Sequence, residues 1–140
     1  MTSRNMIDPF NIGVAAEFFA ASVLIEKGHD VLLPFNRRSK YDLASMKDGE
    51  FYKFQVKRAN WVSPPNTTSK YLRVQTQSKG IKYEKEDIDY FLFVCPERRM
   101  WMVPVEEVNH FRIITLDKRV QNERNWSTSA RFESERYLIT

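Results

Sequence analysis

The sequence predicts an α/β fold in which an N-terminal helix packs on a mixed β-sheet. Three observations lead to this expectation: a capped, apolar, helix-like segment opens the chain, several short strands with at least two hairpins follow it, and little helix comes afterwards. A run of strands after one helix favours this arrangement over a doubly wound parallel sheet.

The length and composition of the chain indicate one intracellular domain. With 140 residues, 42% of them hydrophobic, the chain can enclose one core but is too short for two ordinary domains. We therefore expect a single domain over residues 1–140, with its core at about 10–115. The single cysteine, Cys95, cannot form an internal disulfide, so packing must hold the fold together, and a reducing, cytoplasmic setting fits best. No secretory signal is recognisable before Pro9, and no membrane span is expected.

The first element is expected to be a helix of roughly five turns. Asp8 would cap it, Pro9 would take its first position, and Gly28 would stop it. Its expected buried face consists of Val14, Phe18, Ala21, Leu24 and Ile25. Glu17 falls within this face, where a carboxylate needs a hydrogen bond or a cation unless it reaches solvent at the edge.

Strands are expected to follow the helix. A short buried strand is expected at 31–34, and a hairpin joins strands 41–46 and 50–58 through a turn at 47–49. On strand 50–58, period-two alternation separates Tyr52, Phe54 and Val56 from Lys53, Gln55 and Lys57. The later expected elements are a strand at 71–76, a second hairpin from 90–95 and 100–103, a helical turn at 105–109, and a closing strand or partner contact at 137–139.

The first hairpin brings polar side chains together. Asp42 and Gln55 lie on neighbouring strands near the end away from the turn, and Gln55 shares a face with Lys57. The Asp42 carboxylate, the Gln55 amide and the backbone carbonyl of Val56 are oxygen ligands of the kind that Mg²⁺ accepts. Lys57 would stand beside the metal-bound water or a phosphate.

Positive charge is unevenly distributed. Residues 53–82 contain seven Lys or Arg residues and no Asp or Glu, and a second basic cluster, 37–40, precedes Asp42. Such a surface attracts a polyanion, although a solvated basic face would look the same. The candidate DNA contacts are Arg37, Arg38, Lys40, Arg58, Trp61, Lys70, Arg73, Lys79 and Lys82. No glycine-rich phosphate loop is recognisable, so no nucleotide cofactor is expected.

These residues carry a family resemblance. Glu17 in the first helix, Tyr41-Asp42-Leu43 on one strand and the segment 54–59 on the next resemble the PD-(D/E)XK nuclease superfamily. The Gln-Val-Lys core, 55–57, is most similar to its branch of homing endonucleases encoded by group I introns. The pattern at 89–91 and 101–104 is similar to that branch too, and the likeness covers roughly 13–108.

The resemblance implies a PD-(D/E)XK core fold and a Mg²⁺-dependent endonuclease acting on double-stranded DNA, with Mn²⁺ able to substitute. It implies that Asp42 is a metal ligand, Gln55 the second motif position, Lys57 the catalytic lysine, and Glu17 the helix carboxylate that supports metal or water. Tyr41 stands where the family has Pro. Gln55 stands where most members have an acid, which should weaken divalent binding or favour a single ion.

Other functions remain open from the sequence. A Holliday-junction resolvase, a DNA-binding module whose nuclease site has decayed, and an accessory protein with a solvated basic face are the alternatives. Because specific DNA interfaces bury about 1,000 Å² or more and cleavage of both strands needs two active centres, we expect a homodimer or homotetramer. The C-terminal segment is expected to serve DNA contact or assembly through Arg112, Lys118, Arg119 and Arg124.

Overall fold

The computed structural model describes residues 8–36, 38–66, 68–120 and 133–140. Its main sheet has five strands in the order β1-β2-β3-β8-β9. They are β1 (Asp30–Leu32), β2 (Leu43–Lys47), β3 (Glu50–Arg58), β8 (Tyr90–Val94) and β9 (Met100–Pro104). β3 and β8 run parallel and the other neighbours antiparallel, so the sheet is mixed. With α1 (Pro9–Glu26) packed on it, the expected fold class is confirmed.

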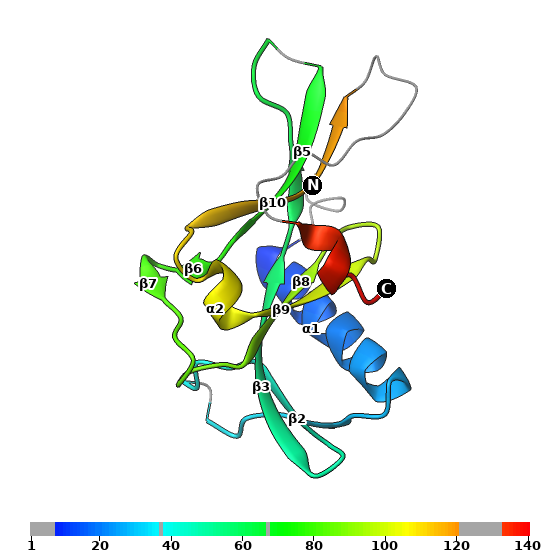
Figure 1. Cartoon of the computed structure of the whole chain (residues 1–140), viewed down its shortest axis with the longest axis vertical. Coiled ribbons are helices and arrows are strands. Elements are labelled where there is room, and N and C mark those ends of the chain that lie inside the picture. The colour runs from blue at the N-terminus through cyan, green and yellow to red at the C-terminus, as the bar shows by residue number, and fades with distance from the viewer. Residues whose placement is uncertain (1–7, 37, 67, 121–132) are drawn as a thin grey trace, which may run out of the picture.

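A second sheet was not expected from the sequence. It has the order β10-β5-β4 and consists of β4 (Asn60–Val62), β5 (Ser69–Gln75) and β10 (Ile113–Val120). We call these three strands the ribbon, because Figure 1 shows β5 and β10 projecting beyond the rest of the chain. The remaining elements are the hairpin of β6 (Gln77–Ser78) and β7 (Ile81–Lys82), the expected helical turn α2 (Val105–Val108), and the 3-10 helix η2 (Ser134–Tyr137).

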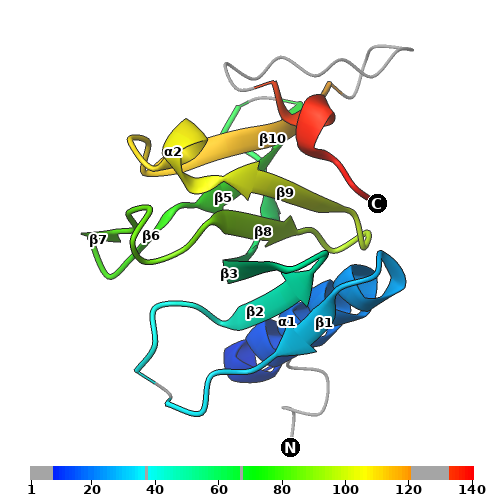
Figure 2. The same ribbon diagram turned by 60° about the horizontal axis from the view of Figure 1, so that its bottom comes forward.

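The two faces of the main sheet carry separate cores. On one face, Phe54, Val56 and Leu92 pack against α1. On the other face, Phe91 and Phe93 pack with apolar residues of the ribbon. Figure 2 shows α1 beside β1 and β2 and the ribbon at the other end of the molecule. The expected alternation on β3 is therefore confirmed, since Phe54 and Val56 face the helix.

The limits of α1 agree with the sequence, and its expected buried face was right for Leu24 but wrong for Phe18 and Ile25. Asp8 accepts a hydrogen bond from the Phe10 N–H at 2.9 Å, as an N-cap does. Phe18 and Ile25 are 73% and 58% exposed. The residues that α1 buries are Ala16, Ala20, Val23 and Leu24. Apolar side chains surround most of this helix, so periodicity could not select a face, and the small alanines permit close approach to the sheet.

The length and mean hydropathy of α1, 1.3 over 18 residues, would also suit a membrane span. This is weak evidence, because a helix that covers a sheet passes the same test. Here Ala20 and Leu24 are fully buried against the core shared with β3.

The turn at 47–49 is confirmed. Asp48 and Gly49 have φ angles of 50° and 80°, the left-handed pair that a two-residue hairpin turn requires. The segment 31–34 was expected to be buried and is not: β1 is an edge strand, and Leu33 is 73% exposed. At the chain end, Leu138 bridges Trp101 and the Ile139 N–H donates to the Met100 carbonyl at 2.9 Å, so the C-terminus lies along β9.

Candidate active site

Asp42 lies at the end of the first hairpin, directly before β2. Its N–H donates to the Phe54 carbonyl at 2.8 Å, and its Oδ2 accepts from the Val56 N–H at 3.0 Å. The pairing of Leu43 with Phe54, continued by one residue, places Asp42 opposite Gln55. β3 thus extends past the start of β2, and the Asp42 carboxylate replaces a strand partner there. Because N–H and C=O of one strand residue point to the same side, the Val56 carbonyl also faces Asp42.

Lys57 lies on the opposite face of β3 from the helix. Its Nζ donates to the Gln77 carbonyl at 3.4 Å and lies 5.4 Å from the centroid of the Tyr83 ring. Burial lowers the pKa of Lys57, and the negative charge of Asp42 offsets part of that change. The ammonium group is therefore held in a partly dry place beside the carboxylate.

Glu17 reaches this place from the helix side. Burial raises the pKa of Glu17 to about 6, and repulsion by the Asp42 charge contributes to that rise. Burial also raises the pKa of Asp42, while the Val56 N–H and the Lys57 charge lower it. The helix and Lys57 belong to opposite faces of the sheet, so the three groups meet at its edge, around Asp42.

These donors fit a hard divalent cation. The oxygens at this edge are two carboxylates, the Val56 carbonyl and, by strand register, the Gln55 amide, which is the chemistry that Mg²⁺ prefers. The two carboxylates are desolvated and repel each other, and a bound cation would offset both effects. Among the residues described, no three His, Cys, Asp or Glu side chains gather at one point, so amide, carbonyl and water oxygens would have to complete the shell.

A pocket of about 500 Å³ adjoins Lys57 on the side of the ribbon. Two of the expected DNA contacts, Arg58 and Arg73, line it together with Asn60 and Gln75. Lys79 lies at the β6–β7 turn, with a φ angle of 52°, and Arg38 lies in the exposed loop ahead of Asp42.

Two other expected contacts form ion pairs, and three further residues lie away from the pocket or outside the described residues. Lys40 pairs with Asp87 at 3.2 Å and Lys82 with Glu84 at 3.7 Å, so acids outside the acid-free stretch offset both charges. Lys70 lies on β5 with its side chain on the opposite face from Arg73. Arg37 and Arg124 lie outside the described residues.

Trp61, another of the expected DNA contacts, makes contacts within the protein. Its Nε1 donates to Glu97, and the guanidinium of Arg119 lies 4.5 Å from its ring centroid. Trp61 packs against the core between the ribbon and the main sheet. It is a strand anchor, because it pairs with buried Leu72 and must point the same way.

Tyr83 belongs to the surroundings of Lys57 and had no signal in the sequence. Burial raises the pKa of the Tyr83 phenol, a hydrogen bond with Ser78 lowers it, and the Asp42 charge raises it. Tyr83 follows the β6–β7 hairpin, and only the return of that hairpin to β3 brings its ring to Lys57. Contacts of this range cannot be read from local spacing.

Comparisons with known proteins found a matching family, a similar phage protein and a solved structure of similar fold. Residues 7–135 match the family of PD-(D/E)XK endonucleases. The chain is 33% identical over 85 residues to "Protein 5.3" of Escherichia phage T7, which covers 61% of this chain and 71% of that protein. The solved structure of the bacterial homing endonuclease I-Ssp6803I is similar in fold, with a TM-score of 0.69 and 22% identity over 87% of this chain and 86% of that one.

Proposed function

Because this chain belongs to the PD-(D/E)XK endonuclease family, we propose that it is a Mg²⁺-dependent endonuclease that hydrolyses phosphodiester bonds in double-stranded DNA. The observation that carries the proposal is the meeting of Asp42, Glu17 and Lys57 at one sheet edge, with their charges interacting. The finer proposal is a site-specific enzyme of the homing type, working as one domain in the cytoplasm. The Gln-Val-Lys core at 55–57 and the fold shared with a homing endonuclease support it.

The residues have distinct roles in this proposal. Asp42, Glu17, Gln55 and the Val56 carbonyl would hold the cation, which would supply Lewis-acid activation of water and phosphate. Lys57 would donate to a phosphate oxygen and offset the charge that grows there. The water oxygen would bond to phosphorus as the water gives up a proton to solvent, one ester P–O bond would break, and the departing alkoxide would take up a proton from solvent.

Incubating the purified protein with a pool of random-sequence duplexes tests this function. Mg²⁺ or Mn²⁺ is expected to support cleavage and EDTA to abolish it, because the metal ion would be the Lewis acid that activates the water and the phosphate. Salt-sensitive binding without cleavage under either metal would instead indicate a decayed nuclease. A strong preference for four-way junctions over linear duplex would indicate a resolvase.

Glu17 is expected to make the metal-free protein less stable as pH rises through about 6. A carboxyl whose pKa is raised in the folded state holds its proton there longer than in the unfolded state, so its ionisation opposes folding. Glu17→Gln should flatten this part of the curve of melting temperature against pH, relative to the wild type. Glu26→Gln, which changes an exposed carboxyl at the end of the same helix, is the matched control. Parallel curves for Glu17→Gln and the wild type would remove Glu17 from the site.

Gln55→Glu is expected to tighten Mn²⁺ binding roughly tenfold, or ~1.4 kcal/mol. The substitution adds a negative charge opposite Asp42, which strengthens a site for a hard cation and increases repulsion when the cation is absent. Calorimetric titration of the wild type and the variant with Mn²⁺ measures the difference. Equal affinities would place Gln55 outside the ligand shell.

We also propose that the enzyme is a homodimer or homotetramer assembled through the outward face of α1. Phe10, Phe18 and Ile25 on this helix are 74%, 73% and 58% exposed, and an apolar helix face of this kind is typical of an interface. Light scattering should give a mass above that of one chain, and Phe18→Glu should reduce it. A wild-type monomer in the presence of DNA would contradict the proposal.

A further inference from the structure

The two faces of the ribbon differ in what they present. The register pairs Arg73 with Asn60 on one side and Thr115 on the other, and it pairs Tyr71 with Val62 and Lys118. Since Leu72 and Val74 between them are buried against the core, these side chains point away from the body. We call this set, together with Gln75 and Ile113, the outward face of the ribbon.

The opposite face is bound to the body by charged and polar contacts. Arg99 pairs with Asp117 at 3.2 Å, and Ser134 donates to the Leu116 carbonyl at 2.6 Å. Trp61 of β4 also donates a hydrogen bond to Glu97, which lies in the turn between β8 and β9. These contacts hold the ribbon in one position, which a surface that reads a partner needs.

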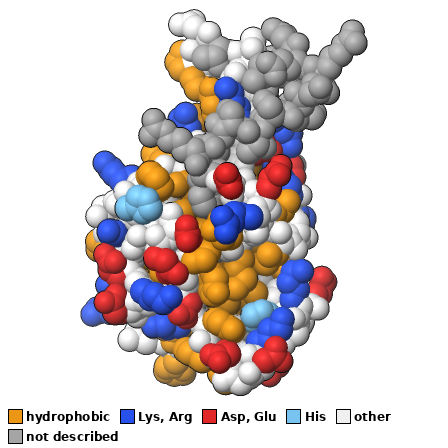
Figure 3. All heavy atoms as spheres, in the orientation of Figure 1, with side chains coloured by type: hydrophobic (Ala, Val, Ile, Leu, Met, Phe, Trp, Pro, Cys, Tyr) orange, Lys and Arg blue, Asp and Glu red, His pale blue; other side chains and the backbone are white. Residues whose placement is uncertain are grey.

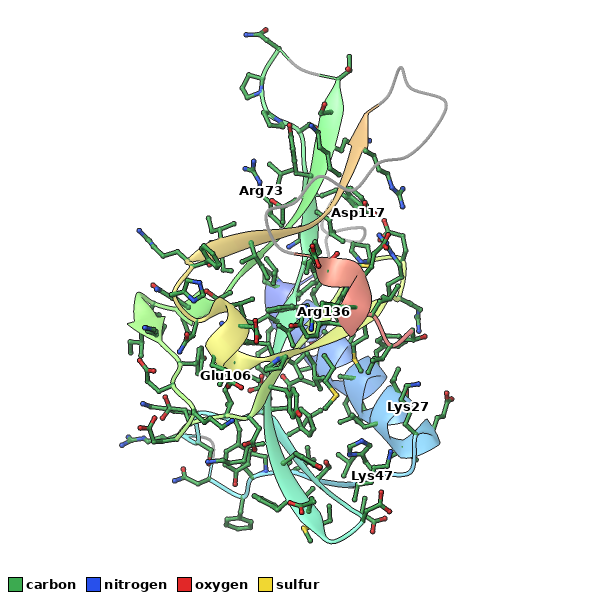
Figure 4. The ribbon with its side chains drawn as sticks, in the orientation of Figure 1. Lys27, Lys47, Arg73, Glu106, Asp117 and Arg136 are labelled. Atoms are coloured by element: carbon green, nitrogen blue, oxygen red, sulfur yellow. The ribbon has the colours of Figure 1, made fainter. Side chains whose placement is uncertain are left out.

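Two cations of the outward face, Arg73 and Lys118, and the adjoining Arg58 of β3 have no acidic partner in the part of the chain that the structure describes. The ion pairs found there involve Lys40, Lys82, Lys85, Arg99 and Arg119, and none of them includes Arg58, Arg73 or Lys118. Instead, the Arg73 guanidinium and the Lys118 ammonium lie 4.9 Å and 5.4 Å from the centroid of the Tyr71 ring. Figure 4 shows Arg73 and Asp117 on different sides of the ribbon, and Figure 3 shows Lys and Arg side chains around β5.

The outward face is continuous with the candidate active site. Arg58, Asn60 and Arg73 line the same pocket as Lys57. A polyanion that reaches Lys57 would therefore extend along this face.

We infer that the outward face of the ribbon enters the major groove of the duplex and reads its sequence, with Arg73 contacting a guanine. The inference rests on the proposed nuclease function. The major groove admits a two-stranded β-ribbon, such as the projecting pair β5 and β10, and an arginine fork that donates to guanine O6 and N7 is the commonest specific contact there. The stacking of Arg73 on Tyr71 orients that fork, while Lys118 and Arg58 are placed to meet phosphates on either side.

The length of β5 limits where the sequence is read. Seven residues at about 3.3 Å each span roughly 20 Å. This corresponds to about six base pairs at ~3.4 Å per pair. The guanine read by Arg73 should therefore lie within about six base pairs of the scissile phosphate.

Selection from the random-duplex pool tests this inference, using Asp42→Asn protein so that bound DNA survives. We expect the selected sites to share a guanine close to the cleavage position, and Arg73→Ala in the same background to lose preference for it by about tenfold. Replacing that guanine by 7-deazaguanine, which lacks N7, should weaken binding of the parent protein and leave Arg73→Ala binding unchanged. Inosine, which lacks only the minor-groove amino group, should be tolerated. Lys70→Ala, on the other face of β5, should leave the selected sequence unchanged.

Two results would overturn the inference. One is an unchanged selected sequence for Arg73→Ala with uniformly weaker binding, which indicates a phosphate contact. The other is the absence of any shared sequence with the parent protein. Cleavage of the pool by the wild-type protein in Mg²⁺, measured separately, shows whether the nuclease function itself has failed or only the assignment of the reading surface.

Discussion

Replacing Asp42 with asparagine is expected to reduce Mg²⁺-dependent DNA cleavage by at least ~100-fold. Even mutation of a residue that only hydrogen-bonds to a metal ligand typically costs about 10- to 100-fold in metal affinity or activity, and Asp42 is expected to be a ligand itself. The asparagine Oδ1 can still accept the Val56 N–H bond that Asp42 accepts at 3.0 Å. Its neutral side chain also removes repulsion with Glu17, whose pKa the Asp42 charge helps to raise. The melting temperature of the metal-free variant should therefore equal or exceed that of the wild type, while activity is lost.

An Asp42→Asn variant that is stable but inactive would distinguish a metal-binding role of Asp42 from a structural one. A structural role for Asp42 would lower the melting temperature together with activity, whereas a metal-binding role separates them. Duplex binding without metal should be retained or strengthened, since the variant carries one negative charge fewer. Asp48→Asn, which changes an exposed carboxyl in the hairpin turn at the other end of β2, is the matched control for both measurements. Cleavage by Asp42→Asn at the wild-type rate would contradict its role.

Lys57→Met is the second substitution with a large expected effect, a loss of about 10²- to 10³-fold in cleavage rate. Methionine fills similar space and removes the ammonium whose Nζ lies 3.4 Å from the Gln77 carbonyl and 5.4 Å from the Tyr83 ring centroid. Because burial lowers the pKa of Lys57, keeping its charge there opposes folding, and the variant should not be less stable.

Metal binding separates the two variants. Lys57→Met should bind Mn²⁺ as well as the wild type or better, because it removes a positive charge beside the ligands, whereas Asp42→Asn should bind it poorly. Lys53→Met is the matched control on the same face of β3, since Lys53 donates to the Glu86 carbonyl at 2.7 Å, whereas the Asp42 carboxylate turns toward Lys57 to accept from the Val56 N–H. If Lys57→Met retained wild-type cleavage, or if Lys53→Met lost as much, Lys57 would not be the catalytic lysine.

Local signals were sufficient for the hairpin that carries the site. Asp48 and Gly49 specify a two-residue turn, the turn sets the register, and the register places Asp42 opposite Gln55. The alternation on β3 then assigns Lys57 to the face away from the helix. The Asp8 cap and its Phe10 N–H bond likewise depend only on neighbours in the chain.

The features that the sequence did not reveal depend on distant segments. β10 pairs with β5 across about forty residues, so the ribbon and its outward face had no local signature. The pairing of Lys40 with Asp87 and the packing of Tyr83 beside Lys57 come from the same long-range folding. On α1, apolar residues on nearly every side concealed which face meets the sheet, and the sheet selected Ala16 and Ala20 rather than Phe18.

Anomalous diffraction from crystals of the wild-type protein soaked in Mn²⁺ tests the central claim most directly. A single strong peak is expected at the edge of the main sheet, within about 2.5 Å of an Asp42 carboxylate oxygen and of the Val56 carbonyl oxygen, with Glu17 on its helix side. No peak there at saturating Mn²⁺, or a peak elsewhere that Asp42 does not ligate, would contradict the account.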